Sequence, residues 1–359
     1  MTVEEGRTMS VTIVDLELYL VEIGCVGQDP PVRSLLVRLV THRGLEGWGE
    51  AQTSWRAAEL PARRNALLPV LAGRSIFEIE DLLGLEALRS APLRCAVEMA
   101  SWDLVGRAAR QPLCHLFGGG YRRRIPLAVR LSGRSPREFA TLARELDEQG
   151  FHSQIVPSCG DVQQDVETLL AVREVLPGRA ELRLDGAAGY GMDSARDLCG
   201  DLEGLGLQFV LDPLKTPELD QVASLRRQTS VPLAVRRAIR SPRDVLALVR
   251  CGAAPFIVVD LQSVGGLVPA RKCAAIAQAA DLGASLANGP SLGIGIAAML
   301  QLASAAPAYS ICNECPHHHL QDDVLVEPLE TADGLIAVPQ GPGLGVEVDR
   351  AKVERYQVT

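Results

Sequence analysis

Ionisable and amide side chains stand at or just after the ends of short apolar runs in the second half of the sequence. They are Asp185 after ELRL, Asp212 after FVL, Arg236 and Arg237 after VPLAV, Asp260 ending FIVVD, Asn288 after GASLA, Glu314 in SICNE, and His317 to His319 just beyond. An arginine guanidinium can hold a carboxylate by two parallel hydrogen bonds and stabilise an oxyanion. Carboxylates and imidazoles can move protons when burial or neighbours adjust their pKa. These residue types favour chemistry on a small anion.

The apolar runs predict the elements that must position these side chains. They are IPLAVRL (125), HSQIV (152), ELRLDG (181), LQFVLDP (207), VPLAV (231), PFIVVDL (255), GASLAN (283) and AYSICNE (308). A helical pattern follows each run and the runs recur about every 25 residues, which is the repeat of an eight-stranded parallel β/α barrel. Loops after barrel strands line the mouth of the active site. Of two adjacent residues on a strand only one faces inward, so only one of Arg236 and Arg237 can act there.

The rest of the chain predicts a second, smaller unit. Residues 11–23 and 34–51 alternate apolar and polar side chains, and helical patterns follow at about 57–70, 75–88 and 92–110. We expect an α+β capping domain over 1–124, a barrel domain over 125–320, and a C-terminal segment, 321–359, that returns to the cap.

Composition excludes several classes of function. The formal net charge is −8 and no long basic run occurs, so we expect no nucleic-acid partner. No stretch of about 18 apolar residues and no signal-peptide pattern is present, so we expect no membrane association and a cytoplasmic protein.

Four segments resemble signatures of the enolase superfamily, of the mandelate racemase and muconate lactonizing enzyme type. They are GLEGWGEA (44–51), AVEMASWDLVGRAARQPLCHLFGG (96–119), VGGLVPARKCAAIA (264–277) and DGLIAVPQGPGLGVEVD (333–349). The resemblance implies a modified TIM barrel with a capping domain and a homo-oligomer. It also implies racemase or epimerase, dehydratase (lyase) or cycloisomerase chemistry at the α-carbon of a carboxylate, although a shared fold does not fix function.

The resemblance also implies a Mg²⁺ held by carboxylates at the ends of the third, fourth and fifth barrel strands, and this sequence departs from that pattern. Asp185 matches the first ligand. Leu211 stands at the second, with Asp212 one residue out of phase, and Arg236 and Arg237 stand at the third. A cation there repels Mg²⁺, so we expect no metal and no other cofactor.

The implied bases are replaced too. A strand lysine pair is missing, with Ile155 and Pro157 at those positions and Gln154 as a polar neighbour. Asp260 matches an Asp that orients a catalytic His, but Asn288 stands in place of that His and cannot act as a base. Glu314 matches an acid that contacts the substrate carboxylate, and His317 in the following loop offers an imidazole.

Three hypotheses follow. In the first, the protein binds a small carboxylate and transfers protons without metal, with Arg236 or Arg237 as the electrophile and Asp260, Glu314 or a histidine of 317–319 moving protons. Asn288 is included in this catalytic set by its position. In the second, the barrel is a non-catalytic anion-binding pseudoenzyme. In the third, it is an ordinary Mg²⁺-dependent racemase, dehydratase or cycloisomerase with a strand bulge at Asp212. The candidate substrate-binding residues are Trp55, Arg56, Gln154, Asp212 and His317. Side-chain composition does not identify the substrate.

Overall fold

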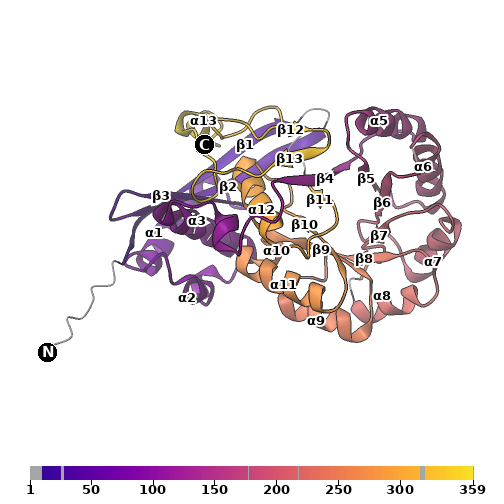
Figure 1. The fold of residues 1–359 in the computed structure, drawn as a ribbon, viewed down its shortest axis with the longest axis horizontal. Coiled ribbons are helices and arrows are strands. Elements are labelled where there is room, and N and C mark those ends of the chain that lie inside the picture. Colours follow the sequence, from indigo (N-terminus) through magenta and orange to yellow (C-terminus); the bar gives the residue numbers. More distant parts are fainter. Residues whose placement is uncertain (1–9, 26–27, 177, 217, 316–319, 359) are drawn as a thin grey trace.

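The computed structural model describes residues 10–25, 28–176, 178–216, 218–315 and 320–358. Figure 1 shows an N-terminal unit packed on one side of a ring of strands and outer helices.

The N-terminal unit is an antiparallel meander covered by helices. Its strands are β1 (Ile13–Cys25), β2 (Gln28–Thr41) and β3 (Glu46–Gln52), in the order β1-β2-β3. Two short 3-10 turns (Ala57–Glu59 and Glu86–Leu88) and the helices α1 (Leu60–Leu71), α2 (Ile79–Leu83), α3 (Ala91–Ala109) and α4 (Leu113–Leu116) follow. Alternate residues of β1, such as Leu16, Leu18 and Leu20, are buried in a core shared with α1 and α3. The expected α+β unit is therefore present.

The eight predicted apolar runs each contain one barrel strand. They are β4 (Arg124–Arg130), β5 (Ser153–Pro157), β6 (Glu181–Asp185), β7 (Phe209–Leu211), β8 (Leu233–Val235), β9 (Phe256–Asp260), β10 (Gly283–Ala287) and β11 (Asn313–Glu314). Neighbours from β4 to β10 pair in parallel, and β11 pairs with β4. Asn313 Oδ1 accepts the backbone N–H of Leu286 at 2.7 Å, which connects β11 to β10. The predicted (β/α)8 barrel with a capping domain is confirmed.

The barrel helices lie outside the ring of strands (Figure 1). They are α5 (Pro136–Glu148), α6 (Val162–Val175), α7 (Met192–Asp201), α8 (Leu219–Arg226), α9 (Pro242–Cys251), α10 (Leu261–Val264), α11 (Leu267–Ala279) and α12 (Gly293–Ala305). Phe209, Leu211, Ala234, Val258, Ala287 and Ile311 form the apolar cluster contributed by the strands themselves. None of the described helices is long and apolar enough to cross a membrane.

The C-terminal segment contacts both parts of the chain. It contains β12 (Thr331–Ala332), β13 (Leu335–Ala337) and α13 (Arg350–Arg355), and β13 pairs antiparallel with β4 of the barrel. The backbone N–H of Val358 donates to Leu20 of β1 at 2.7 Å. Asp103 of α3 accepts the backbone N–H of Leu344 at 2.8 Å.

Two buried carboxylates of the N-terminal unit hold it on the barrel. Glu50, at the end of β3, accepts the backbone N–H groups of Leu292 at 2.6 Å and Gly295 at 2.8 Å, at the start of α12. Glu98 of α3 accepts those of Leu267 at 2.5 Å and Val268 at 2.8 Å, at the start of α11. The first N–H groups of a helix have no partner within the helix and carry partial positive charge, so carboxylates satisfy them.

A glycine makes the contact of Glu98 possible. Gly266 has φ +130°, and a Cβ there would lie only 1.9 Å from Glu98 Oε2. Only glycine combines that backbone conformation with that close approach. The VGG sequence before α11 is therefore explained by the carboxylate that caps this helix.

Burial raises the pKa of both Glu50 and Glu98 to about 7, although the backbone N–H groups favour ionisation. A carboxyl whose pKa is higher in the folded than in the unfolded protein stabilises the fold below its unfolded pKa. That contribution is lost as the pH rises from about 4.5 to about 7.

We therefore expect Glu98→Gln to lower the melting temperature, because an amide replaces one of the two acceptor oxygens, but also to flatten its decline between pH 4.5 and 7. Calorimetric melts across this range measure both effects. Glu174→Gln, on the exposed face of α6, is the matched control. A Glu98→Gln slope equal to that of the unmodified protein would contradict the proton linkage of Glu98.

Candidate functional site

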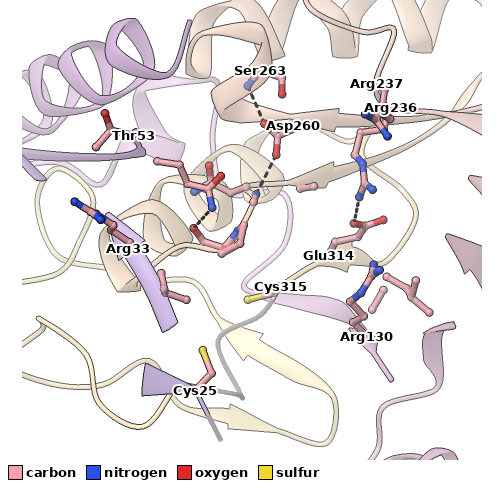
Figure 2. A pocket seen from close by; sticks show the side chains of 18 of the residues that line it. Cys25, Arg33, Thr53, Arg130, Arg236, Arg237, Asp260, Ser263, Glu314 and Cys315 are labelled. Atoms are coloured by element: carbon pink, nitrogen blue, oxygen red, sulfur yellow. Dashed lines mark hydrogen bonds and ion pairs between the residues drawn. The ribbon is translucent and has the colours of Figure 1, made fainter. Parts of the chain in front are cut away.

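A cavity of about 1020 Å³ lies at the carboxyl ends of the barrel strands, against the N-terminal unit (Figure 2). Barrel residues form most of its wall, and Arg33, Gln52, Thr53 and Ser54 come from the cap. Its charged lining residues are Arg33, Arg130, Arg236, Arg237, Arg240, Asp260 and Glu314. Five arginines against two carboxylates make this lining cationic in a chain whose net charge is −8.

Arg236 joins two of the predicted acidic residues. Its guanidinium donates to Asp185 Oδ2 at 3.0 Å and to Glu314 Oε2 at 2.8 Å. Its Nε lies 4.0 Å from Asp212 Oδ2. These residues come from the ends of β6, β7, β8 and β11, so the guanidinium ties together strands from opposite parts of the ring.

Arg130, at the end of β4, completes this arginine–carboxylate cluster of Arg130, Asp185, Asp212, Arg236 and Glu314. It donates to Asp185 Oδ2 at 2.7 Å, while 44% of its side chain stays exposed. Arg130 was not among the predicted site residues, although it ends β4 just as Asp185 ends β6.

The pKa values in the cluster follow from burial and the two cations. Burial raises the pKa of Asp185, but Arg236 and Arg130 outweigh it and hold that pKa below its ordinary value. Burial dominates for Glu314 and raises its pKa despite Arg236. Burial also raises the pKa of Asp212, to about 6, against the hydrogen bonds from Arg236 and Arg237.

Asp212, predicted to bind substrate, does not line the cavity. It follows the last residue of β7 with φ +44°, a left-handed conformation. Its carboxylate accepts the backbone N–H of Arg236 at 2.9 Å and of Arg237 at 3.0 Å, and it does not line the cavity. Leu211, one residue earlier, is buried in the apolar cluster of the strands. The left-handed turn after β7 therefore directs the Asp212 carboxylate to the end of β8. The pairing of β7 with β6 and β8 shows no bulge.

The cluster does not fit the divalent metal that the resemblance implies. Mg²⁺ requires oxygen ligands in a near-octahedral arrangement. Asp185 Oδ2 accepts from two guanidinium groups, and Leu211 and Arg236 stand at the other two implied ligand positions. Among the described residues no group of three His, Cys, Asp or Glu side chains is arranged to hold a metal ion.

Arg237 points differently from Arg236. It donates to the backbone carbonyl of Ala187 at 3.0 Å and forms no ion pair with any described residue. Both arginines line the cavity, because β8 ends at Val235 and they follow it, so the expectation that only one of them can act there is wrong. Only Arg236 lies within the cluster. Figure 2 shows Arg236 above Glu314, with Arg130 below.

Asp260 and Asn288 also line the cavity, and Figure 2 shows Asp260 away from Arg236 and Glu314. Asp260 Oδ1 accepts the backbone N–H of Ser263 at 2.8 Å and Oδ2 that of Gly289 at 3.0 Å, so Asp260 caps α10 and holds the loop after β10. The Asn288 side chain is buried, and neither its nitrogen nor its oxygen has a hydrogen-bond partner among the described residues.

Three further residues that we predicted to contact substrate do not line the cavity, and a fourth lies outside the described residues. Gln154 is buried and donates to Ala143 at 2.8 Å, towards α5, because the pleat turns it away from the barrel interior. The Trp55 ring packs against Arg63, whose Cζ lies 4.7 Å from the ring centroid. The side chain of Arg56 is 85% exposed, and neither Trp55 nor Arg56 lines the cavity. His317 is among the residues that the structure does not describe.

A buried arginine that the sequence reasoning missed lies inside the barrel. Arg183 of β6 is 1% exposed, donates to Gln208 Oε1 at 2.6 Å and to the Cys312 carbonyl at 3.1 Å, and covers the ring of Phe209. Its position in the middle of ELRLD is the available signal, because a charged residue inside a barrel strand must find partners there.

We expect Arg236→Gln to destabilise the protein by about 3–5 kcal/mol, because Glu314 then loses its ion-pair partner and Asp185 keeps only the half-exposed Arg130. Without Arg236 the pKa values of both carboxyls rise, so protonation relieves the defect and the loss is larger at pH 8 than at pH 5. Urea unfolding at both pH values measures this. Arg237→Gln is the matched control, and equal losses for the two variants would contradict a structural role for Arg236.

Comparison with known families agrees with this architecture. The sequence model "Mandelate racemase / muconate lactonizing enzyme, N-terminal domain" matches residues 12–118, and "Enolase C-terminal domain-like" matches residues 138–352.

Individual relatives span nearly the whole chain. Muconate cycloisomerase 1 of Rhodococcus opacus is 29% identical, with 90% of each chain covered. The L-Lys-D/L-Arg epimerase of Methylococcus capsulatus is 31% identical over 88% of this chain and 91% of its own. The solved structure of 2-chloromuconate cycloisomerase from Rhodococcus opacus 1CP superposes with a TM-score of 0.88 at 26% identity, covering 98% of this chain and 100% of that one. The chain therefore belongs to the enolase superfamily, in its mandelate racemase and muconate lactonizing enzyme group.

Proposed function

We propose that the barrel mouth binds a small carboxylate without a divalent metal, and that arginine guanidinium groups supply the positive charge. The observation that carries this is the cationic cavity. Among its arginines, Arg33, Arg237 and Arg240 form no ion pair with any described residue. Cations that line a cavity without an acidic partner attract an anion and can hold a carboxylate by paired hydrogen bonds.

The arginine–carboxylate cluster would orient the bound carboxylate. Arg130 and Arg236 each commit part of their guanidinium to carboxylates of the protein and still line the cavity with the rest. Their geometry is fixed by these ion pairs, so their remaining N–H groups are aimed before a ligand arrives. Preorganised donors of this kind lower the cost of binding.

Proton transfer at the α-carbon of the bound carboxylate is the activity that this site supports best. Glu314 lines the cavity, and burial raises the pKa of Glu314, which makes its ionised form a better base. The guanidinium of Arg236 beside it would stabilise the negative charge that develops on the carboxylate oxygens. The names of the relatives, a cycloisomerase and an epimerase, agree with this class of reaction.

A specific observation favours a second candidate, anion binding without turnover. Ile155 and Asn288 line the cavity at positions where the family resemblance implies bases, and neither side chain accepts a proton near neutral pH. The two candidates share the binding step and differ only in the proton transfer.

For the binding step, we expect carboxylate affinity measured by titration calorimetry to be the same in EDTA and in Mg²⁺. Arg130→Gln and Arg237→Gln should each weaken binding by about 10-fold or more, since a hydrogen bond to a charged group contributes about 1.5–3 kcal/mol. Arg179→Gln, an exposed arginine remote from the cavity, should bind normally. Affinity that disappears in EDTA would contradict metal-free binding.

For the proton transfer, deuterium incorporation at the α-carbon of a bound carboxylate in D₂O is the direct measurement. We expect exchange in the unmodified protein, none in Glu314→Gln, and retained exchange in Asp260→Asn, which removes the other lining carboxylate. Binding without exchange in the unmodified protein would instead support the non-catalytic candidate.

A further inference from the structure

Glu314, the base of the proposed proton transfer, ends the shortest of the described barrel strands. β11 contains only Asn313 and Glu314, which pair in parallel with β4. Towards β10, the side chain of Asn313 accepts the backbone N–H of Leu286 at 2.7 Å. Most strands are longer, and a ladder of two residues supplies few backbone hydrogen bonds. The position of the Glu314 carboxylate therefore depends on side chains that hold this strand from elsewhere in the barrel.

Arg183 makes such a contact from inside the barrel. Two of its guanidinium N–H groups donate to the backbone carbonyl of Cys312, each at 3.1 Å, two residues before Glu314. Arg183 belongs to β6, and β5 and β4 separate β6 from β11 in the ring. The side chain therefore reaches across the barrel interior and holds β11 one residue before its ladder with β4 begins.

Arg183 is itself fixed by its surroundings. Its Nε donates to Gln208 Oε1 at 2.6 Å, and its Cζ lies 4.9 Å from the centroid of the Phe209 ring. Only 1% of Arg183 is exposed. Moving this guanidinium would break hydrogen bonds that water cannot replace at a buried position, which is costly. Arg183 is thus a rigid support for β11.

Two guanidinium groups act on Glu314 from different levels of the barrel. Arg236 donates to Glu314 Oε2 at 2.8 Å at the cavity. Arg183 shares the inward face of β6 with Asp185 but precedes it by two residues, about 6–7 Å along the strand. Burial raises the pKa of Glu314, whereas the charges of Arg236 and then of Arg183 lower it. Arg183 therefore affects both the position and the charge of this carboxyl group.

We infer that Arg183 is a positioning residue for the proton transfer, because it holds β11 so that the Glu314 carboxylate stays at the cavity beside Arg236. This inference rests on the proposed function and assigns a part of it to a side chain that does not line the cavity. Since Arg183 does not reach a ligand there, its loss slows the proton transfer and leaves carboxylate binding intact.

The test measures two quantities for each variant: the rate of deuterium incorporation at the α-carbon of a bound carboxylate, and carboxylate affinity by titration calorimetry. We expect Arg183→Met to slow incorporation by about 100-fold, since a displacement of about 1 Å at a reacting group has an effect of that order. Its affinity should stay unchanged. Arg183→Lys keeps the charge but lacks the planar fork, so it should lose less of the rate.

The matched control is Arg173→Met. Arg173, on α6 outside the ring of strands, also donates to two backbone carbonyls, those of Ala180 at 3.0 Å and Gly206 at 3.1 Å. It does not contact β11, so the rate of incorporation and the affinity should both stay at the values of the unmodified protein.

The pH dependence of the rate separates positioning of Glu314 from a general effect on stability. The base acts in its ionised form, so the rate rises with pH through the pKa of Glu314. Arg183 favours that ionised form, and Arg183→Met should therefore move the midpoint of this rise to higher pH. Arg183→Lys should move it less. A purely structural role would lower the melting temperature and leave the midpoint where it is.

The possible outcomes are distinct. If the unmodified protein shows no incorporation, the proposed proton transfer fails and the inference fails with it. If folded Arg183→Met keeps the rate and the midpoint, or loses binding and rate together, the positioning role is overturned while the proposed function stands. If Arg183→Met does not fold, Gln208→Leu decides. It removes the acceptor of Arg183 Nε at a half-buried residue, and it should slow incorporation at unchanged affinity; an unchanged rate would overturn the inference.

Discussion

The ion pairs of Arg236 with Asp185 and Glu314 are the interaction on which the barrel mouth depends. Carboxylates at the ends of β6 and β11 are buried, and a buried charge without a counter-ion is strongly destabilising. A guanidinium between them removes that cost and fixes the strand ends in one arrangement. It also places a cation where the family resemblance implies a metal, so the chemistry that we propose for the site is that of a guanidinium, which donates hydrogen bonds to an oxyanion.

A second set of buried carboxylates determines how the cavity is closed. Glu50 and Glu98 cap the first turns of α12 and α11 and thereby fix the cap against the barrel. Glu50 holds the last residue of the loop 289–292, Leu292, and the first two residues of this loop line the cavity. Because the cap is held there, Arg33 and Thr53 form a constant wall opposite the barrel arginines. Asp260 and Asp212 make the same kind of contact within the barrel, because the carboxylate of each accepts backbone N–H groups.

The sequence predicts the barrel well and the site in part. Strand positions are predictable because each buried strand is a short apolar run with a helical pattern after it, and Asp185, Arg236 and Glu314 end such runs. Arg130 was missed because the family resemblance gave it no role. Gln154 and Asp212 do not line the cavity. The pleat of β5 turns Gln154 towards α5, and the left-handed backbone conformation after β7 turns Asp212 towards the end of β8. The roles of Glu50, Glu98 and Arg33 depend on contacts between residues far apart in the chain, which local patterns do not encode.

The central claim is that arginine charge stands in place of a metal, and anomalous scattering tests it most directly. A crystal grown with Mn²⁺ and a carboxylate, measured at the manganese edge, would show any metal at the barrel mouth. If the charge of Arg236 stands in place of a metal, we expect no anomalous peak near Asp185. The guanidinium of Arg236 should still lie between Asp185 and Glu314, and the added carboxylate should be bound to the arginines. A peak coordinated by Asp185, with Arg236 displaced, would contradict it.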